Sequence, residues 1–367
     1  MIRSIFLFLD RSHLLHHASL QPIETTGLGL FRTHIATDHA IAPKFLNGIF
    51  NLFERDRQGL EIDPILLISS IRLMVNLGLY DSYFEPKFLH VTREYYGRVA
   101  VLESTSDTLA EYLQECSKEW TKETARCDGF CLDLSTRRSI VALMEDEFIR
   151  KQLPFLVDKR NVGELIMDSD SESLATLYNL LSRIGDAGAQ LKPAWESQII
   201  SFGVGIIADV AQESEMVRRL LEFKASLDAI TRGPFKNDES LVYSLRESFT
   251  HFINARREGE SMARHSKPAE MVAKYVDGLL RDGTKRAVVG TQGDDDARLA
   301  HALEQVLDLF RFIQGKDVFE AFYKKDLARR LLMDRSASGD AERSMLAKLK
   351  TGNYYPTAQR ELRLTRL

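Results

Sequence analysis

The sequence predicts an all-α protein made of helices stacked in series, and three observations support this. Apolar residues recur every three to four positions over long segments of the 367-residue chain. No convincing segment alternates apolar and polar residues, as a half-buried strand would. Glycine and proline number only 21 and 9, so the chain has few breaks and its helices can be long.

The first helix is predicted over residues 2–17, where Ile5, Phe6, Phe8 and Leu9 cover more than one helix face. Packing in a core explains at least one of those faces. The other face could present apolar surface to a partner protein. A break at 20–22 separates this helix from a second, over residues 27–38.

Two more helices have clear starting signals. Pro43 opens one whose apolar residues share a face, and Asp63 can cap the next, with Pro64 at its first position. The segment 65–79 is apolar nearly all round, which predicts a helix buried between its neighbours. The residues that share the face after Pro43 are Phe45, Ile49, Leu52 and Phe53.

The remaining helices follow from the same three-to-four spacing. They are predicted over residues 83–102, 109–131, 135–151, 171–184, 187–209, 216–230, 238–253, 268–282 and 294–313. Between the last two, Gly283, Gly290, Gly293 and three consecutive aspartates predict an exposed, mobile loop.

The segment 316–350 predicts two amphipathic helices joined by a serine-rich corner. One face of the first helix is charged and includes Arg329 and Arg330, while Ser336 and Ser338 can cap the second. Asp340 and Glu342 suit the positive N-terminal end of that second helix. The apolar stripe of the first helix consists of Val318, Phe319, Phe322, Tyr323, Leu327, Leu331 and Leu332.

This segment resembles a known family. The run KDVFEAFYKKDLARRLL, followed by SASGDAERSMLAKLK, is similar to the most recognisable block of the cullins, the scaffolds of multi-subunit ubiquitin ligases. Earlier runs, among them IRSIFLFLDR, LGLFRTHI, FEPKFL and KPAEMVAKYVD, most resemble the cullin-4 class. The resemblance extends from about Ile2 to Lys350.

The resemblance implies five-helix cullin repeats stacked like an α-solenoid rod, followed by the start of a helical bundle. On that basis residues 1–17 end a first repeat, and residues 18–154 and 155–282 form a second and a third. Residues 283–297 are the mobile loop, and 298–350 begin the four-helix bundle. Residues 351–367 do not resemble the family, and we expect this tail, an alternative or mis-spliced end, not to pack on the body.

The function implied is that of a non-catalytic scaffold, which bridges a substrate adaptor and a RING subunit in ubiquitin-dependent protein degradation. The implied adaptor is the β-propeller protein of cullin-4 ligases, contacted by Ile5, Phe8, Leu9 and Arg11. We expect weakened adaptor binding, because other contacting helices of the family precede residue 2. RING binding is expected only of a full-length form, and the implied location is the nucleus and cytoplasm. The alternative is an α-solenoid interaction module without a ligase role.

Local motifs give little support for an enzyme, a cofactor or a metal. Residues 203–208 fit the G-x-G-x-x-A dinucleotide pattern, but no second strand with an acidic residue follows, so close helix packing is the simpler interpretation. His13, His16 and His17, with Asp10 one turn earlier, could bind a metal, although nothing local completes the shell.

Charge and cysteine content narrow the options further. The net charge of −4 and the small basic cluster around Arg329 favour a solvated helix face over nucleic-acid binding. Cys116, Cys127 and Cys131 have no tandem metal-binding spacing, which predicts reduced, buried thiols. The apolar run at Ile5 to Leu9 is far too short to span a membrane.

Overall fold

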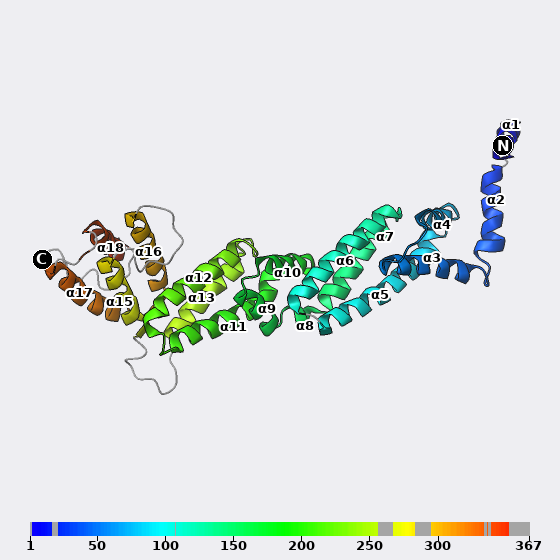
Figure 1. Ribbon diagram of the computed structural model, residues 1–367. Coiled ribbons are helices and arrows are strands. Elements are labelled where there is room, and N and C mark those ends of the chain that lie inside the picture. Colours follow the sequence, from blue (N-terminus) through cyan, green and yellow to red (C-terminus); the bar gives the residue numbers. More distant parts are fainter. Residues whose placement is uncertain are drawn as a thin grey trace. The chain divides into compact units, whose positions relative to one another are not determined.

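The computed structural model describes residues 2–16, 21–106, 108–255, 267–282, 295–333, 336 and 339–351. Every regular element in this part of the chain is a helix, which confirms the predicted all-α class (Figure 1). The chain divides into two compact units, residues 1–155 and 156–367. The finer division into repeats stays a prediction.

The first unit contains the helices α1 to α7 and three π-helical segments that continue them. The bounds are α1 Ile2–His16, α2 Ile23–Phe31, η1 Arg32–Ala36, α3 Ala42–Arg57, α4 Pro64–Asn76, η2 Tyr80–Phe84, α5 Glu85–Ser106, α6 Leu109–Gly129, α7 Leu134–Met144 and η3 Glu145–Arg150. The short helix α8, Leu153–Leu156, lies at the boundary between the units.

The second unit contains α9 to α18. Its elements are α9 Lys159–Met167, α10 Ser171–Ile184, α11 Ala187–Ala208, η4 Glu213–Glu215, α12 Met216–Arg232, α13 Glu239–Asn254, α15 Lys267–Asp282, α16 Asp295–Phe310, α17 Lys316–Leu332 and α18 Gly339–Thr351. The prediction omitted α8 and α9, which are short. The helix predicted over residues 294–313 is α16.

Aspartate side chains fix where many of these helices begin. Asp63 accepts hydrogen bonds from the backbone N–H groups of Ile65 and Leu66, as predicted. The same arrangement caps five other helices, and each such cap stabilises a helix by about 0.5–2 kcal/mol. The five aspartates are Asp133, Asp158, Asp170, Asp186 and Asp238.

The core of the first unit is an aromatic cluster. Phe53 of α3 and Phe84 of η2 both pack on Phe88 of α5, with ring centroids 4.5 and 5.3 Å apart. The buried face of α3 follows the helical spacing Leu46, Ile49, Phe50, Phe53 and Arg57. Of the four residues predicted for that face, Phe45 and Leu52 are only half-buried.

The prediction that α4 is buried between neighbours is wrong. Only its face with Leu67, Ile71 and Met74 is buried. On the other side Ile65 is 74% exposed, and Leu66 is also exposed. The hydrophobicity of a helix gives no information about how many neighbours surround it, and in this unit α4 has neighbours on one side only.

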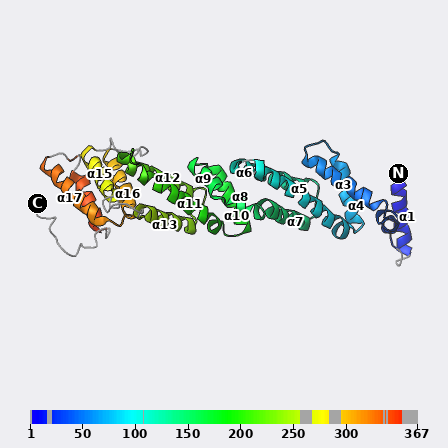
Figure 2. The same ribbon diagram turned by 90° about the horizontal axis from the view of Figure 1, so that it is seen from below.

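In the second unit, α11 and α13 pack along each other at close range (Figures 1 and 2). Gly203 of α11 makes this possible, because a Cβ atom there would lie 2.5 Å from Cζ of the buried Phe252 ring on α13. Residues 198–208 are helical throughout, so the dinucleotide pattern has no strand before its glycines. The close-packing interpretation is confirmed.

Several predictions fall outside the described residues or side chains. They concern the mobile loop at 283–294, the tail from 352, His17, Ser338, and the side chains of His13 and His16. No single helix in the described ranges is both long and apolar enough to cross a membrane. Residues 64–76 and 80–105 reach the required composition only as a pair bent by 108°.

Candidate protein-interaction surface

Helix α1 presents apolar side chains to solvent on every face. Ile5 is 52% exposed, Phe8 74% and Leu9 53%, and Phe6, Leu7 and Arg11 are exposed as well. None of the described side chains of α1 is buried, so the core-packing interpretation of this helix finds no support. Clusters of exposed apolar side chains mark interaction surfaces in folded proteins.

The exposed apolar surface continues beyond α1. Helix α2 has no buried residue, and Leu30, Phe31 and Ile35 are exposed on α2 and η1. The carboxylate of Asp10 accepts a hydrogen bond of 3.1 Å from the backbone N–H of Ile23, at the start of α2. This bond links the two helices through the carboxylate of Asp10, which the metal interpretation considered as a third ligand. No group of three metal-binding side chains occurs among the described residues.

The predicted packing stripe of α17 holds for its central residues. Phe319, Tyr323 and Leu327 are buried, and the rings of Phe319 and Phe310 lie 4.3 Å apart. Val318 and Phe322 are half-buried. The prediction that Leu331 packs in the core is wrong, because its side chain is 59% exposed. Leu332 is exposed too.

Arg330 takes the place on the stripe that was predicted for Leu331. Its guanidinium is 2% exposed, donates to Glu342 of α18 at 2.8 Å and pairs with Asp277 of α15. Burial disfavours the charged guanidinium, but the hydrogen bonds to Glu342 and Asp277 outweigh it and raise the pKa of Arg330. The residue therefore holds three helices together and does not lie on a solvated face.

The rest of the basic cluster is largely neutralised. Lys324 pairs with Glu320 at 2.7 Å, and Arg329 lies 3.6 Å from Asp326. Exposed pairs of this kind contribute little to stability, but they reduce the positive field that a nucleic acid would need. The structure thus favours the interpretation of a helix face with ion pairs.

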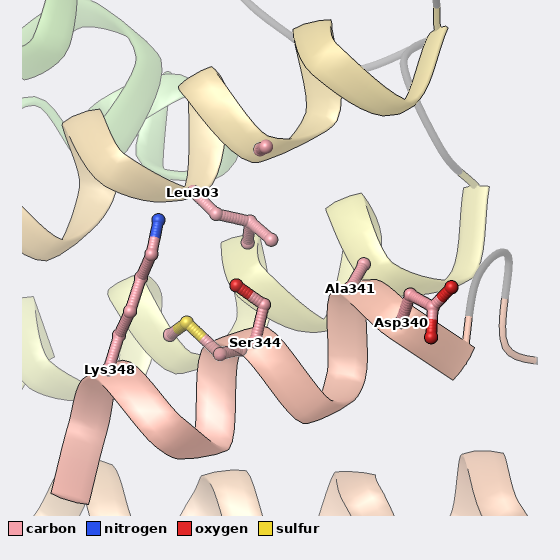
Figure 3. Close-up of a pocket in the computed structure, with 7 residues that line it drawn as sticks. Leu303, Asp340, Ala341, Ser344 and Lys348 are labelled. Carbon is pink, nitrogen blue, oxygen red and sulfur yellow. The ribbon is translucent and has the colours of Figure 1, made fainter.

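A cavity of about 290 Å³ lies between α16 and α18 (Figure 3). Leu303 points into it from α16, and Ser344 faces it from α18. At one side the ammonium group of Lys348 pairs with Glu304 at 2.7 Å. The lining contains one hydroxyl, from Ser344, and two ionisable side chains, Asp340 and Lys348.

A buried polar network in the first unit was not predicted from the sequence. Arg57 donates to Glu123 at 2.5 Å, and Glu123 also accepts from Tyr96 at 2.6 Å and Arg126 at 3.1 Å. Arg57 and Glu123 are each about 1% exposed at their side chains. The sequence did contain a signal for this network, because Arg57 lies four positions after Phe53 on the buried face of α3. This network joins α3, α5 and α6 inside the first unit.

The cysteines are partly as predicted. Cys116 and Cys127 are buried, and burial raises the pKa of Cys116 to about 12 and that of Cys127 to about 11. Thiols with such values are unreactive near neutral pH. Cys131 is exposed, which corrects the prediction for that residue.

The comparisons with known proteins agree with the all-helical fold. A family model described as the cullin alpha solenoid domain matches residues 1–355. Human Cullin-4A is 40% identical over 95% of this chain and 44% of its own length. Cullin-4 of Dictyostelium discoideum is 33% identical over 96% of the chain, and Cullin-3A of Arabidopsis thaliana is 30% identical over 96%. The chain spans less than half the length of these relatives.

Proposed function

Because the chain belongs to the cullin family, we propose that it is part of the scaffold of a cullin–RING ubiquitin ligase and that it contacts a substrate adaptor through α1. The scaffold has no bond chemistry of its own. It raises the effective concentration of the substrate near the transferred ubiquitin by holding both partners on one stiff support.

The exposed apolar surface of α1 carries the adaptor part of the proposal. Five consecutive apolar side chains, residues 5–9, are exposed there, and Phe8 is the most exposed of them. A large aromatic side chain on an exposed helix is the kind of residue that anchors protein interfaces. The partner we propose is the β-propeller adaptor of cullin-4 ligases, and Ile5, Leu9 and Arg11 complete the contact.

The test is co-expression with this adaptor, followed by size-exclusion chromatography and titration of the purified components. We expect a complex in which a few central anchors carry most of the affinity. Phe8→Ala should weaken it about tenfold or more. The matched control is Ile65→Ala on α4, since Ile65 is also apolar and has the same exposed fraction.

Two outcomes would contradict the proposal in different ways. Tight adaptor binding that survives Phe8→Ala would mean that the contact lies elsewhere on the chain. No adaptor binding by a folded protein, even with adaptor in large excess, would favour an α-solenoid module without a ligase role.

We also propose that the protein acts in the nucleus and the cytoplasm, where cullin ligases find their substrates. This part of the proposal rests on family membership alone. Immunofluorescence of the tagged protein tests it, and confinement to a compartment other than the nucleus and the cytoplasm would contradict it.

A further inference from the structure

Asp10 is the one described side chain of α1 that forms a hydrogen bond with a described residue of another helix. Its carboxylate accepts from the backbone N–H of Ile23 at 3.1 Å. Asp10 is half-buried, and so is Leu14, one turn later, whereas every other described side chain of α1 is exposed. Since residues four apart share one helix face, the face with Asp10 and Leu14 is the one that lies against α2.

Helix α2 receives at its first residue a hydrogen bond that its own N-cap does not supply. The first N–H groups of a helix have no partner within the helix. Pro22 is at the N-cap position of α2 and makes no capping bond through its side chain. Other helices of the chain carry an aspartate at this position, as α4 does with Asp63. In α2 the acceptor comes instead from α1, 13 residues earlier in the chain.

The bond also decides which face of α1 is turned away from α2. With 3.6 residues per turn, Phe8 lies about 160° around the helix from Asp10, and Ile5 lies about 140° from it in the other direction. When Asp10 faces α2, Phe8 and Ile5 therefore point away from α2. Their exposed fractions of 74% and 52% agree with this orientation.

We propose that Asp10 is a positioning residue for the adaptor contact of α1. This inference rests on the proposed function, because it concerns the same surface. Asp10 does not contact the adaptor. It holds α1 in one orientation on α2, so that Phe8 and Ile5 face the adaptor before binding. A pre-oriented helix loses less conformational freedom when a partner binds, which strengthens binding. The role requires an oxygen acceptor at position 10 and not a negative charge.

The first test titrates the β-propeller adaptor with the full chain carrying substitutions at position 10. We expect Asp10→Ala to weaken binding about tenfold or more. Asp10→Asn should stay within about threefold of the wild type, because an asparagine oxygen accepts the same kind of bond at a helix N-terminus. An equal loss in Asp10→Asn and Asp10→Ala would overturn the positioning role, since it would indicate a charge contact with the adaptor.

Asp63→Ala is the matched control. It removes hydrogen bonds of the same type, from the backbone N–H groups at the start of α4, but leaves the link between α1 and α2 intact. We expect its adaptor affinity to equal that of the wild type. An equal loss in Asp63→Ala and Asp10→Ala would overturn the proposal, because the loss would then follow from weakening any helix of the unit.

A second test measures the orientation of α1 without the adaptor. Spin labels at Leu15 of α1 and Thr25 of α2, both exposed, report the distance between the two helices. The background is Cys131→Ser, because Cys131 is an exposed thiol. We expect a narrow distance distribution with Asp or Asn at position 10 and a broad one in Asp10→Ala. An equally narrow distribution in Asp10→Ala would overturn the proposal.

The two tests separate failure of this inference from failure of the proposed function. If Phe8→Ala weakens adaptor binding and Asp10→Ala does not, the adaptor contact stands and the positioning role is overturned. If the wild-type chain does not bind the adaptor, the adaptor contact is overturned, and the positioning role with it. The spin labels show in either case whether Asp10 fixes α1 on α2.

Discussion

Gly203 and Gly205 lie two residues apart on α11, yet only one of them faces a neighbouring helix. A Cβ atom on Gly203 would overlap the Phe252 ring, whereas a Cβ atom on Gly205 would meet nothing within 4 Å. Gly203→Ala should therefore destabilise the second unit by about 1–3 kcal/mol through overpacking, less the gain in helix propensity of about 1 kcal/mol. We expect a net loss of stability.

Gly205→Ala is the matched control for this prediction. It brings the same gain in helix propensity without a clash, so it should stabilise the unit by roughly 0.5–1 kcal/mol. Urea unfolding followed by Trp195 fluorescence in a Trp120→Phe background measures both changes, because these are the two tryptophans of the chain. Equal effects of the two substitutions would show that α11 and α13 are not in close contact.

The buried pair of Arg57 and Glu123 predicts sensitivity to acid. Burial disfavours the charged carboxylate of Glu123, but Arg57 and the Tyr96 hydroxyl outweigh it and hold the pKa below its ordinary value of 4.5. A carboxylate whose pKa is lowered by folding stabilises the folded state at pH values above the ordinary pKa of that carboxylate. That stability is lost as the pH falls through the lowered pKa. We therefore expect the free energy of unfolding of the first unit to decrease as the pH falls below about 4.5.

Urea unfolding at several pH values, followed by Trp120 fluorescence in a Trp195→Phe background, measures this decrease. In Glu123→Gln the loss of stability in acid should be smaller, although the variant is less stable at neutral pH because Arg57 keeps no charged partner. The half-exposed Glu54→Gln serves as control. An acid dependence unchanged by Glu123→Gln would contradict the role of this pair.

At the scale of single elements, α17 gives a graded prediction. Phe319 is fully buried and Phe322 only half-buried. Phe319→Ala should cost the second unit about 3–5 kcal/mol, as expected for a buried phenylalanine. Phe322→Ala should cost about 1–2 kcal/mol, because less apolar surface is lost. Urea unfolding that follows Trp195 fluorescence compares the two, and a larger loss for Phe322→Ala would reverse the assignment of the buried face.

The limits of sequence reasoning also show at this scale. Periodicity predicted most helices within a few residues, because apolar stripes and aspartate caps are local signals. It failed for α4, where the number of neighbouring helices decides burial, and for α8 and α9, which are too short to show a period. It placed Arg330 on the solvent face, because its two carboxylate partners are 53 residues before and 12 residues after it in the chain. Contacts of that kind carry no periodic signal.

At the scale of the whole molecule, the all-α class was predictable from composition and spacing. The division into two units at residues 155 and 156 is a property of contacts. The exposed state of α1 could not be predicted either, since its apolar run fits a core as well as an interface. Far-ultraviolet circular dichroism should give a helix content well above the base rate of about one-third. A substantial content of β-sheet would contradict the fold.

Hydrogen–deuterium exchange of α1 tests the central claim most directly. The claim is that residues 2–16 are the part of this cullin scaffold that a substrate adaptor covers. With the β-propeller adaptor in excess, backbone amides of α1 should exchange more slowly, while those on the exposed side of α4 should not change. Protection confined to other helices, or no protection of α1 at saturating adaptor, would contradict the claim.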